Sequence, residues 1–315
     1  MKSRFQHSKL IILFLATRPK FLIASAAPVL VGSALGFSTG GTFSPILFIM
    51  ALAAIMALQA GANMSNDYFD HISKNDWLNE NPTPFSGGSR YIQNAALSPK
   101  VIFFTAFVFF AAGSAIGLVI VLLTRSVFIL ILGLVGLFGG FFYTAPPLKL
   151  GYHSVGEPVI ALLFGLLPVY GSYYLQTRTI DAIVLFPAFI VGMLIFLVIL
   201  VNEFPDAAAD AAVNKRTLVV HFGIAVAVWI YRIVLIMSFV IAAASMLICR
   251  TMFFAGMFYL FTIPIGVVAI AFASKEDLAK PGLYRANRVT ILLHLVGASA
   301  LAAGFLISGF RDLFM

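Results

Sequence analysis

The sequence predicts an all-α fold, a polytopic membrane bundle of nine transmembrane helices. Of its 315 residues, 61% are hydrophobic and 10% are charged, whereas soluble domains carry about 25% charged residues. The apolar residues gather into nine runs, each near the length of about 20 residues that a helix needs to cross a bilayer. Because no low-complexity linker divides the chain, we expect a single transmembrane domain over residues 1–315.

The helices expected in chain order follow these apolar runs. Short loops at 39–44, 124–126, 176–182 and 248–251 follow the odd-numbered spans, which indicates tight connections on one side of the membrane. The predicted spans cover residues 21–38, 45–65, 101–123, 127–143, 156–175, 183–203, 224–247, 252–273 and 289–309.

Two long polar segments follow the second and sixth spans. The segment from Asp67 to Lys100 contains several prolines and glycines that break helices, and the segment from Pro205 to Gly223 is also long. Functional residues are therefore expected on the side of the membrane that carries these segments. The two spans lie four spans apart, which hints at an internal pseudo-repeat.

Lysine and arginine are distributed unequally between the two sides. Fifteen of them, including Lys2, Arg4 and Lys280, fall in the N-terminal segment or after even-numbered spans, and four fall on the other side: Arg125, Arg178, Arg250 and Arg311. The positive-inside rule then predicts a cytoplasmic N-terminus and a multi-pass protein of the inner (cytoplasmic) membrane, with its active site on the cytoplasmic side. This sidedness explains the net charge of +8 without a nucleic-acid partner.

A cleaved signal peptide is the competing interpretation of the N-terminus. Leu10–Ala16 is apolar, and Ala24-Ser25-Ala26 resembles a cleavage site. However, Thr17-Arg18-Pro19-Lys20 interrupts the region that would have to be apolar. We therefore expect the segment before Arg18 to lie along the cytoplasmic interface.

Two acidic clusters stand at the ends of apolar runs, where carboxylates are costly. One is Asn66-Asp67-Tyr68-Phe69-Asp70 with Asp76, and the other is Asn202-Glu203-Phe204-Pro205-Asp206 with Asp210. Residues four apart share a helix face, so two helix ends could present oxygen ligands to each other. The predicted metal ligands are Asn66, Asp70, Asn202, Asp206 and Asp210.

These oxygen donors favour Mg²⁺, which keeps part of its water and shares its coordination with substrate phosphates. Zinc is not indicated, because the five histidines have no histidine or cysteine partner four residues away. The alternative is that the acidic residues are solvated at the ends of loops or cap helices.

Basic residues near the clusters could bind a diphosphate together with the metal. The alternative for each of them is that it only contributes to the excess of Lys and Arg on the cytoplasmic side and binds no ligand. The predicted diphosphate-binding residues are Arg90, Lys149, Lys215 and Arg216.

These motifs resemble the UbiA-type intramembrane aromatic prenyltransferases. The resemblance rests on Arg18-Pro19, on Asn66-Asp67-x-x-Asp70 and on Asp206-x-x-x-Asp210, with Tyr143 and Lys149 between them. Within that family the chain looks most like the dihydroxynaphthoate polyprenyltransferases of menaquinone synthesis, through Gly151-Tyr152, Gly156-Glu157 and Lys215-Arg216-Thr217-Leu218. Two departures, Asn214 and the stretch Tyr143–Lys149, leave hydroxybenzoate open as the acceptor.

The resemblance implies helices around a central cavity with cytoplasmic cap loops. It also implies Mg²⁺-dependent transfer of a polyprenyl group from polyprenyl diphosphate to an aromatic acceptor, within membrane lipid. Tyr143 would face the allylic cation, and Asp67 or Asp76 would orient or deprotonate the acceptor.

Two other classes of membrane protein use acidic residues. An ion-coupled secondary transporter would carry them near mid-span rather than at span ends. An alcohol phosphotransferase of lipid synthesis would carry an Asp-Gly-x-x-Ala-Arg motif, which this sequence lacks.

Overall fold

The computed structural model describes residues 8–40, 42–278, 282 and 284–314. Lys2, Arg4 and Lys280, which entered the charge count above, lie outside the described residues. Every regular element that it describes is helical. In chain order these are α1 (Lys9–Ala16), α2 (Pro19–Gly40), α3 (Pro45–Ile72), α4 (Asn75–Leu78), α5 (Pro99–Thr124), α6 (Val127–Phe142), η1 (Leu150–Tyr152), α7 (Gly156–Ala161), η2 (Leu162–Leu166), α8 (Leu167–Thr177), η3 (Ala182–Val184), α9 (Leu185–Ala212), α10 (Leu218–Ile248), α11 (Met252–Leu260), α12 (Ile263–Phe272), α13 (Lys275–Leu278) and α14 (Arg285–Phe314).

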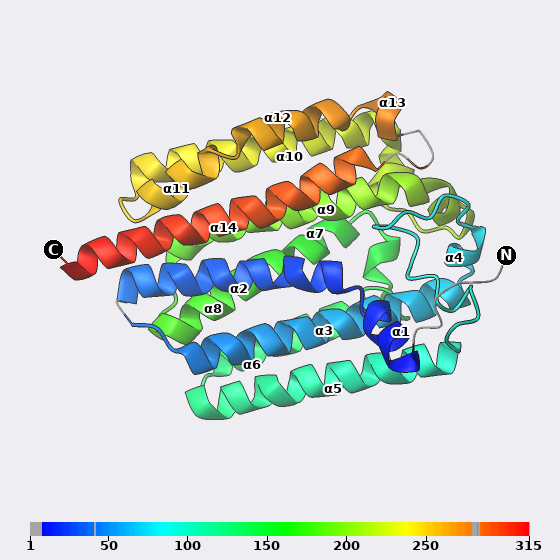
Figure 1. The fold of residues 1–315 in the computed structure, drawn as a ribbon, viewed down its shortest axis with the longest axis horizontal. Helices are drawn as coiled ribbons and strands as arrows, with labels where there is room; N and C mark the ends of the chain where they lie inside the picture. The colour runs from blue at the N-terminus through cyan, green and yellow to red at the C-terminus, as the bar shows by residue number, and fades with distance from the viewer. Residues whose placement is uncertain (1–7, 41, 279–281, 283, 315) are drawn as a thin grey trace.

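The long helices run side by side, and α1 and α4 lie toward the end of the bundle opposite the end of α14 (Figure 1). All nine predicted spans fall on helices. Within the described residues, seven helical segments are long and apolar enough to cross a membrane, and the α11–α12 pair, bent by 46°, makes eight if it is one span. The prediction of an all-α, multi-pass membrane protein is confirmed, whereas the count of nine stays a prediction because α6 has 16 residues.

Two breaks in the helices have clear local causes. Pro264 stands in the first turn of α12, where its missing amide is tolerated but prevents α11 from continuing unbroken. Gly223 breaks α10 with φ +80° and ψ 161°, a backbone conformation that is essentially restricted to glycine. The predicted start of the seventh span at residue 224 coincides with this break.

Helix α9 forms the centre of the bundle. Ile190, Leu194 and Leu197 are fully buried, and the main hydrophobic core gathers around this helix. On α5, by contrast, Phe104 and Leu122 are 68% and 67% exposed, as expected for side chains that face lipid. A largely buried helix at the centre of the core therefore carries the second acidic cluster.

Pro205 interrupts the hydrogen-bond ladder of α9 inside that cluster. Proline has no amide hydrogen, so the Val201 carbonyl, four residues earlier, loses its usual donor. The side chain of Asn287 on α14 replaces it, since its Nδ2 donates to the Val201 carbonyl at 3.0 Å and to Asn202 Oδ1 at 2.8 Å. The functional end of α9 is thus held by α14.

Pro28 has the same effect in α2. It leaves the Ala24 carbonyl without a helical donor, and His294 Nε2 of α14 lies 2.9 Å from that oxygen. The ring nitrogen therefore carries the hydrogen and donates it. Side chains of α14 thus replace the hydrogen-bond donors that are missing at both prolines.

We expect the cost of His294→Leu to depend on Pro28. The change should cost about 1–3 kcal/mol of unfolding free energy, because the Ala24 carbonyl is left buried without a donor. In a Pro28→Ala background the restored backbone amide supplies that donor, so the same change should cost less. Reversible unfolding in mixed micelles measures both values. Leu293→Ala, at a buried neighbour, should cost the same in both backgrounds; equal costs for His294→Leu in the two backgrounds would refute the compensation.

Candidate active site

The two acidic clusters lie on helices rather than in loops. Helix α3 continues to Ile72 and α9 to Ala212, about two turns beyond the predicted ends of these spans at residues 65 and 203. Asp70 is 4% exposed and Asp210 is 1% exposed. The alternative of solvated loop carboxylates is therefore wrong for these two residues, and a buried carboxylate needs a compensating partner.

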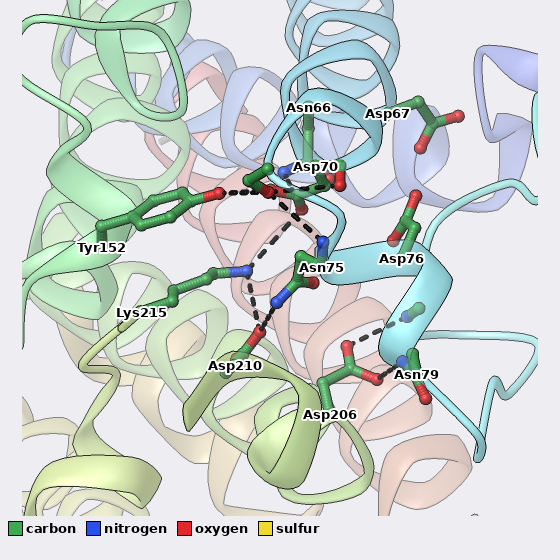
Figure 2. Close-up of polar contacts among 12 residues, drawn as sticks. Asn66, Asp67, Asp70, Asn75, Asp76, Asn79, Tyr152, Asp206, Asp210 and Lys215 are labelled. Carbon is green, nitrogen blue, oxygen red and sulfur yellow. Dashed lines mark hydrogen bonds and ion pairs between the residues drawn. The ribbon is translucent and has the colours of Figure 1, made fainter. Parts of the chain in front are cut away.

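Lys215 joins the two helix ends (Figure 2). Its Nζ lies 3.3 Å from Asp210 Oδ1 and 3.7 Å from Asp70 Oδ2. Burial by itself would lower the pKa of Lys215, but Asp210 and then Asp70 raise it well above its ordinary value. The amino group is therefore charged, and it sits where the two acidic clusters converge.

Further donors fix the Asp70 carboxylate. Asn66 Nδ2 donates to Asp70 Oδ2 at 2.9 Å, and the Tyr152 hydroxyl lies 3.2 Å from Asp70 Oδ1. The ring of Tyr152 is in turn covered by the amino groups of Lys149 and Lys215, 5.0 and 5.7 Å from its centroid. Tyr152 thus links the first cluster to the basic residues.

The polar segment after α3 folds over the second cluster. Asn75 Nδ2 donates to Asp210 Oδ1 at 2.8 Å, and Asn79 Nδ2 donates to Asp206 Oδ1 at 2.7 Å. The Gly87 amide donates to the other Asp206 oxygen at 3.0 Å. This segment, residues 73–98, is hereafter called the lid; that it is a cytoplasmic cap stays a prediction.

Asp67 and Asp76 are held away from the second cluster. Arg18 forms an ion pair with Asp67, and Gln93 Nε2 donates to Asp76 Oδ2 at 3.2 Å. Burial, then the charges of Asp70 and Asp67, raise the pKa of Asp76 to about 8. At neutral pH the Asp76 carboxyl is therefore largely protonated, and a cation bound beside Asp67, Asp70 and Asp76 would favour its ionised form.

A cavity of about 180 Å³ lies beneath the lid. Most predicted site residues line it: Asn66, Asp70, Asp76, Tyr143, Asn202, Asp206, Asp210 and Lys215. Asp67, Arg90, Lys149 and Arg216 do not belong to this lining. Arg90 instead donates to the backbone carbonyl of Asp76, and Arg216 is exposed while its backbone bonds Tyr152 and Ser154.

Sequence reasoning missed four residues of the site. The sequence places Arg18 and Tyr152 in family motifs without indicating a role for either. It gives no motif that contains Asn79, and Asn75 has no predicted role. The asparagines are four residues apart, the same spacing that drew attention to the aspartates, so this signal was present in the sequence. The contacts of Arg18 and Tyr152 join segments distant in sequence and leave no local pattern.

The donor set fits Mg²⁺ bound jointly with a phosphate. Within the described ranges, no three His, Cys, Asp or Glu side chains gather into a complete metal cage. Asp70, Asp206 and Asp210 present hard oxygens from two helices, however, and their present partners are amides, a hydroxyl and one amino group. Mg²⁺ needs only one or two carboxylates when water and phosphate complete its shell.

Comparison with known proteins identifies the family. The model described as "UbiA prenyltransferase family" matches residues 25–281. The chain belongs to this family. It is 32% identical to the 1,4-dihydroxy-2-naphthoate octaprenyltransferase of Haemophilus influenzae over 212 residues, 65% of this chain and 67% of that protein. It is 24% identical to the 2-carboxy-1,4-naphthoquinone phytyltransferase of Synechocystis over 292 residues, 92% of this chain and 91% of that protein.

Solved structures agree on the fold. A UbiA homolog from Archaeoglobus fulgidus bound to GPP and Mg²⁺ superposes with a TM-score of 0.69 at 16% identity, covering 98% of this chain and 100% of that chain. An apo UbiA homolog from Aeropyrum pernix K1 gives 0.65 at 16% identity, covering 91% and 97%. The predicted resemblance to naphthoate-type UbiA enzymes is confirmed, and so is the prediction of a prenyl-transferring enzyme; the transporter and phosphotransferase alternatives are set aside.

We expect Lys215→Met to lower prenyl transfer by about 100-fold or more, the usual cost of removing one preorganised charge at a reacting centre. Arg216→Met should lower it less than about fivefold, because that side chain is exposed at the surface. Initial rates with saturating donor, measured in nanodiscs, compare the two variants. Equal losses at the two positions would contradict the placement of Lys215 between the clusters.

Proposed function

We propose that the UbiA-family enzyme transfers a polyprenyl group from polyprenyl diphosphate to 1,4-dihydroxy-2-naphthoate in menaquinone biosynthesis. The convergence of Asp70, Asp210 and Lys215 under one lid carries this proposal. Relatives at 30–32% identity that are named 1,4-dihydroxy-2-naphthoate octaprenyltransferase support the acceptor.

The diphosphate binds at the polar end of the cavity. Lys215 supplies a fixed positive charge there, and Asn66, Asp70, Asp206 and Asp210 would hold Mg²⁺. Asn202 would contribute less directly, since its Oδ1 already accepts from Asn287. When bound, Mg²⁺ neutralises the charge that develops on the leaving diphosphate.

The lid and the ring of Tyr143 protect and stabilise the reactive prenyl cation. Departure of diphosphate leaves an allylic cation, which would be hydrolysed if water reached it. The lid contacts through Asn75, Asn79 and Gly87 exclude water, and the Tyr143 face offers the cation π-electron density. The electron-rich acceptor ring then attacks, and loss of CO₂ restores its aromaticity. Asp67 orients the lid by accepting from the Ser89 amide at 3.1 Å, and Asp76 does so within the lid by accepting from Gln93.

A second, apolar cavity of about 360 Å³ accepts the prenyl tail. It begins one helical turn from the first, since Gly140 lines the polar cavity and Gly136 the apolar one. Gly117, Gly133 and Gly136 face open space, because a Cβ at any of them meets nothing within 4 Å. According to the positive-inside rule, the polar end faces the cytoplasm. The apolar cavity then extends toward the opposite leaflet, within membrane lipid.

Prenylation of a panel of acceptors tests this function. With one allylic diphosphate and Mg²⁺, mass spectrometry should detect prenylated, decarboxylated 1,4-dihydroxy-2-naphthoate, and chelation of Mg²⁺ should abolish it. Asp70→Ala and Asp206→Ala should each reduce the rate by at least about 100-fold, while Asp181→Ala, in the loop before η3, should not. Exclusive prenylation of 4-hydroxybenzoate would overturn the proposed acceptor, and near-normal activity of either variant would overturn the metal assignment.

We also expect Gly136→Phe to shorten the longest tail that the enzyme accepts. The new side chain fills the apolar cavity, so the rate with a long polyprenyl donor should fall about tenfold relative to geranyl diphosphate, an overpacking cost of 1–3 kcal/mol. Val135→Phe is the matched control, because Val135 is 42% exposed on the other face of α6. A uniform loss with both donors in Gly136→Phe would count against this path for the tail.

A further inference from the structure

Glu203 presents a carboxyl group to the cavity that the diphosphate chemistry does not use. It lines the polar cavity and is 8% exposed. Its Oε2 atom is fully buried and has no hydrogen-bond partner. A buried carboxyl oxygen without a donor is costly, so a ligand that brings a donor is favoured at this point.

Glu157 stands next to Glu203 but does not line the cavity. Glu157, which is 1% exposed, interacts with Glu203, and its own Oε2 is also unpartnered. The other oxygen of Glu157 accepts from the Leu218 amide at 2.6 Å, which fixes this side chain against the start of α10.

The position of Glu203 along α9 separates it from the diphosphate. Glu203, Asp206 and Asp210 are spaced three and four residues apart and so share one helix face. At 1.5 Å per residue, Glu203 lies about 4.5 Å deeper than Asp206 and about 10 Å deeper than Asp210. A group bound by Glu203 therefore sits below the diphosphate, beside the first carbons of the prenyl chain.

The surroundings of Glu203 suit an aromatic ring. Tyr143, Phe164 and Ile199 line the same cavity, and apolar and aromatic side chains of this kind pack against rings. One carboxyl in an apolar wall recognises one donor on an otherwise apolar ligand. A ring hydroxyl on the aromatic acceptor has this chemistry.

We propose that Glu203 is the residue that accepts a hydrogen bond from a ring hydroxyl of the aromatic acceptor, with Glu157 holding it in place. This assignment deepens the proposed function, since it names the part of the site that selects a hydroxylated ring. It predicts that the enzyme distinguishes a ring hydroxyl from a methyl ether of the same shape.

Binding of 1-naphthol and 1-methoxynaphthalene to the protein in nanodiscs tests the proposal without any prenyl donor. The wild-type protein should bind the naphthol up to about tenfold more tightly, the value of one hydrogen bond. Glu203→Leu should remove this preference, and Glu203→Gln, which keeps a carbonyl acceptor, should retain part of it. Glu276→Leu, at an exposed carboxylate on α13, should leave it unchanged.

A preference that survives in Glu203→Leu, or that is absent from the wild-type protein, would overturn the assignment. Steady-state kinetics then give the second readout. In Glu203→Leu the KM for the hydroxylated acceptor should rise about tenfold while the KM for the prenyl diphosphate stays within twofold, and in Glu203→Gln the rise should be smaller; a parallel rise in both KM values would overturn the assignment. Because the binding assay needs no prenyl transfer, loss of the hydroxyl preference and failure of the proposed function are separate results.

Discussion

The contacts of Lys215 with Asp70 and Asp210 hold together the parts on which the active site depends. These two carboxylates come from α3 and α9, helices separated by more than a hundred residues, and they would repel each other without a cation between them. The Lys215 side chain is only 13% exposed, and the same carboxylates keep it charged. In the proposed function, this arrangement is an anion site bordered by oxygen ligands, which suits a substrate that combines a diphosphate with Mg²⁺.

Helix α14 supports this arrangement by supplying hydrogen-bond donors to α2 and α9. Both prolines that interrupt the neighbouring helices leave carbonyl groups that need donors, and Asn287 and His294 provide them. In a membrane, where no water can replace a missing helical donor, such side chains are required rather than optional. The position of the second acidic cluster is consequently set by polar contacts within an otherwise apolar bundle.

The polarity of the cavity lining decreases with depth below the lid. Charged and amide groups gather under the lid, the carboxyl of Glu203 stands about one turn deeper, and a mainly apolar space with several glycines in its lining follows. A prenyl diphosphate has the same order of properties along its length. In the proposed function, this gradient in polarity would place the bond that breaks between the charged groups and the aromatic acceptor.

The sequence by itself determined the fold class, the family and the two acidic clusters, because apolar run length, charge sidedness and four-residue spacing are local properties. It also located Lys215. It did not determine how far α3 and α9 extend past the apolar core, or that Arg216 is exposed while Lys215 is buried. Nor did it assign roles to Arg18, Tyr152 and Glu203. Those features depend on contacts between distant segments, and only tertiary packing decides which charged side chains are enclosed together.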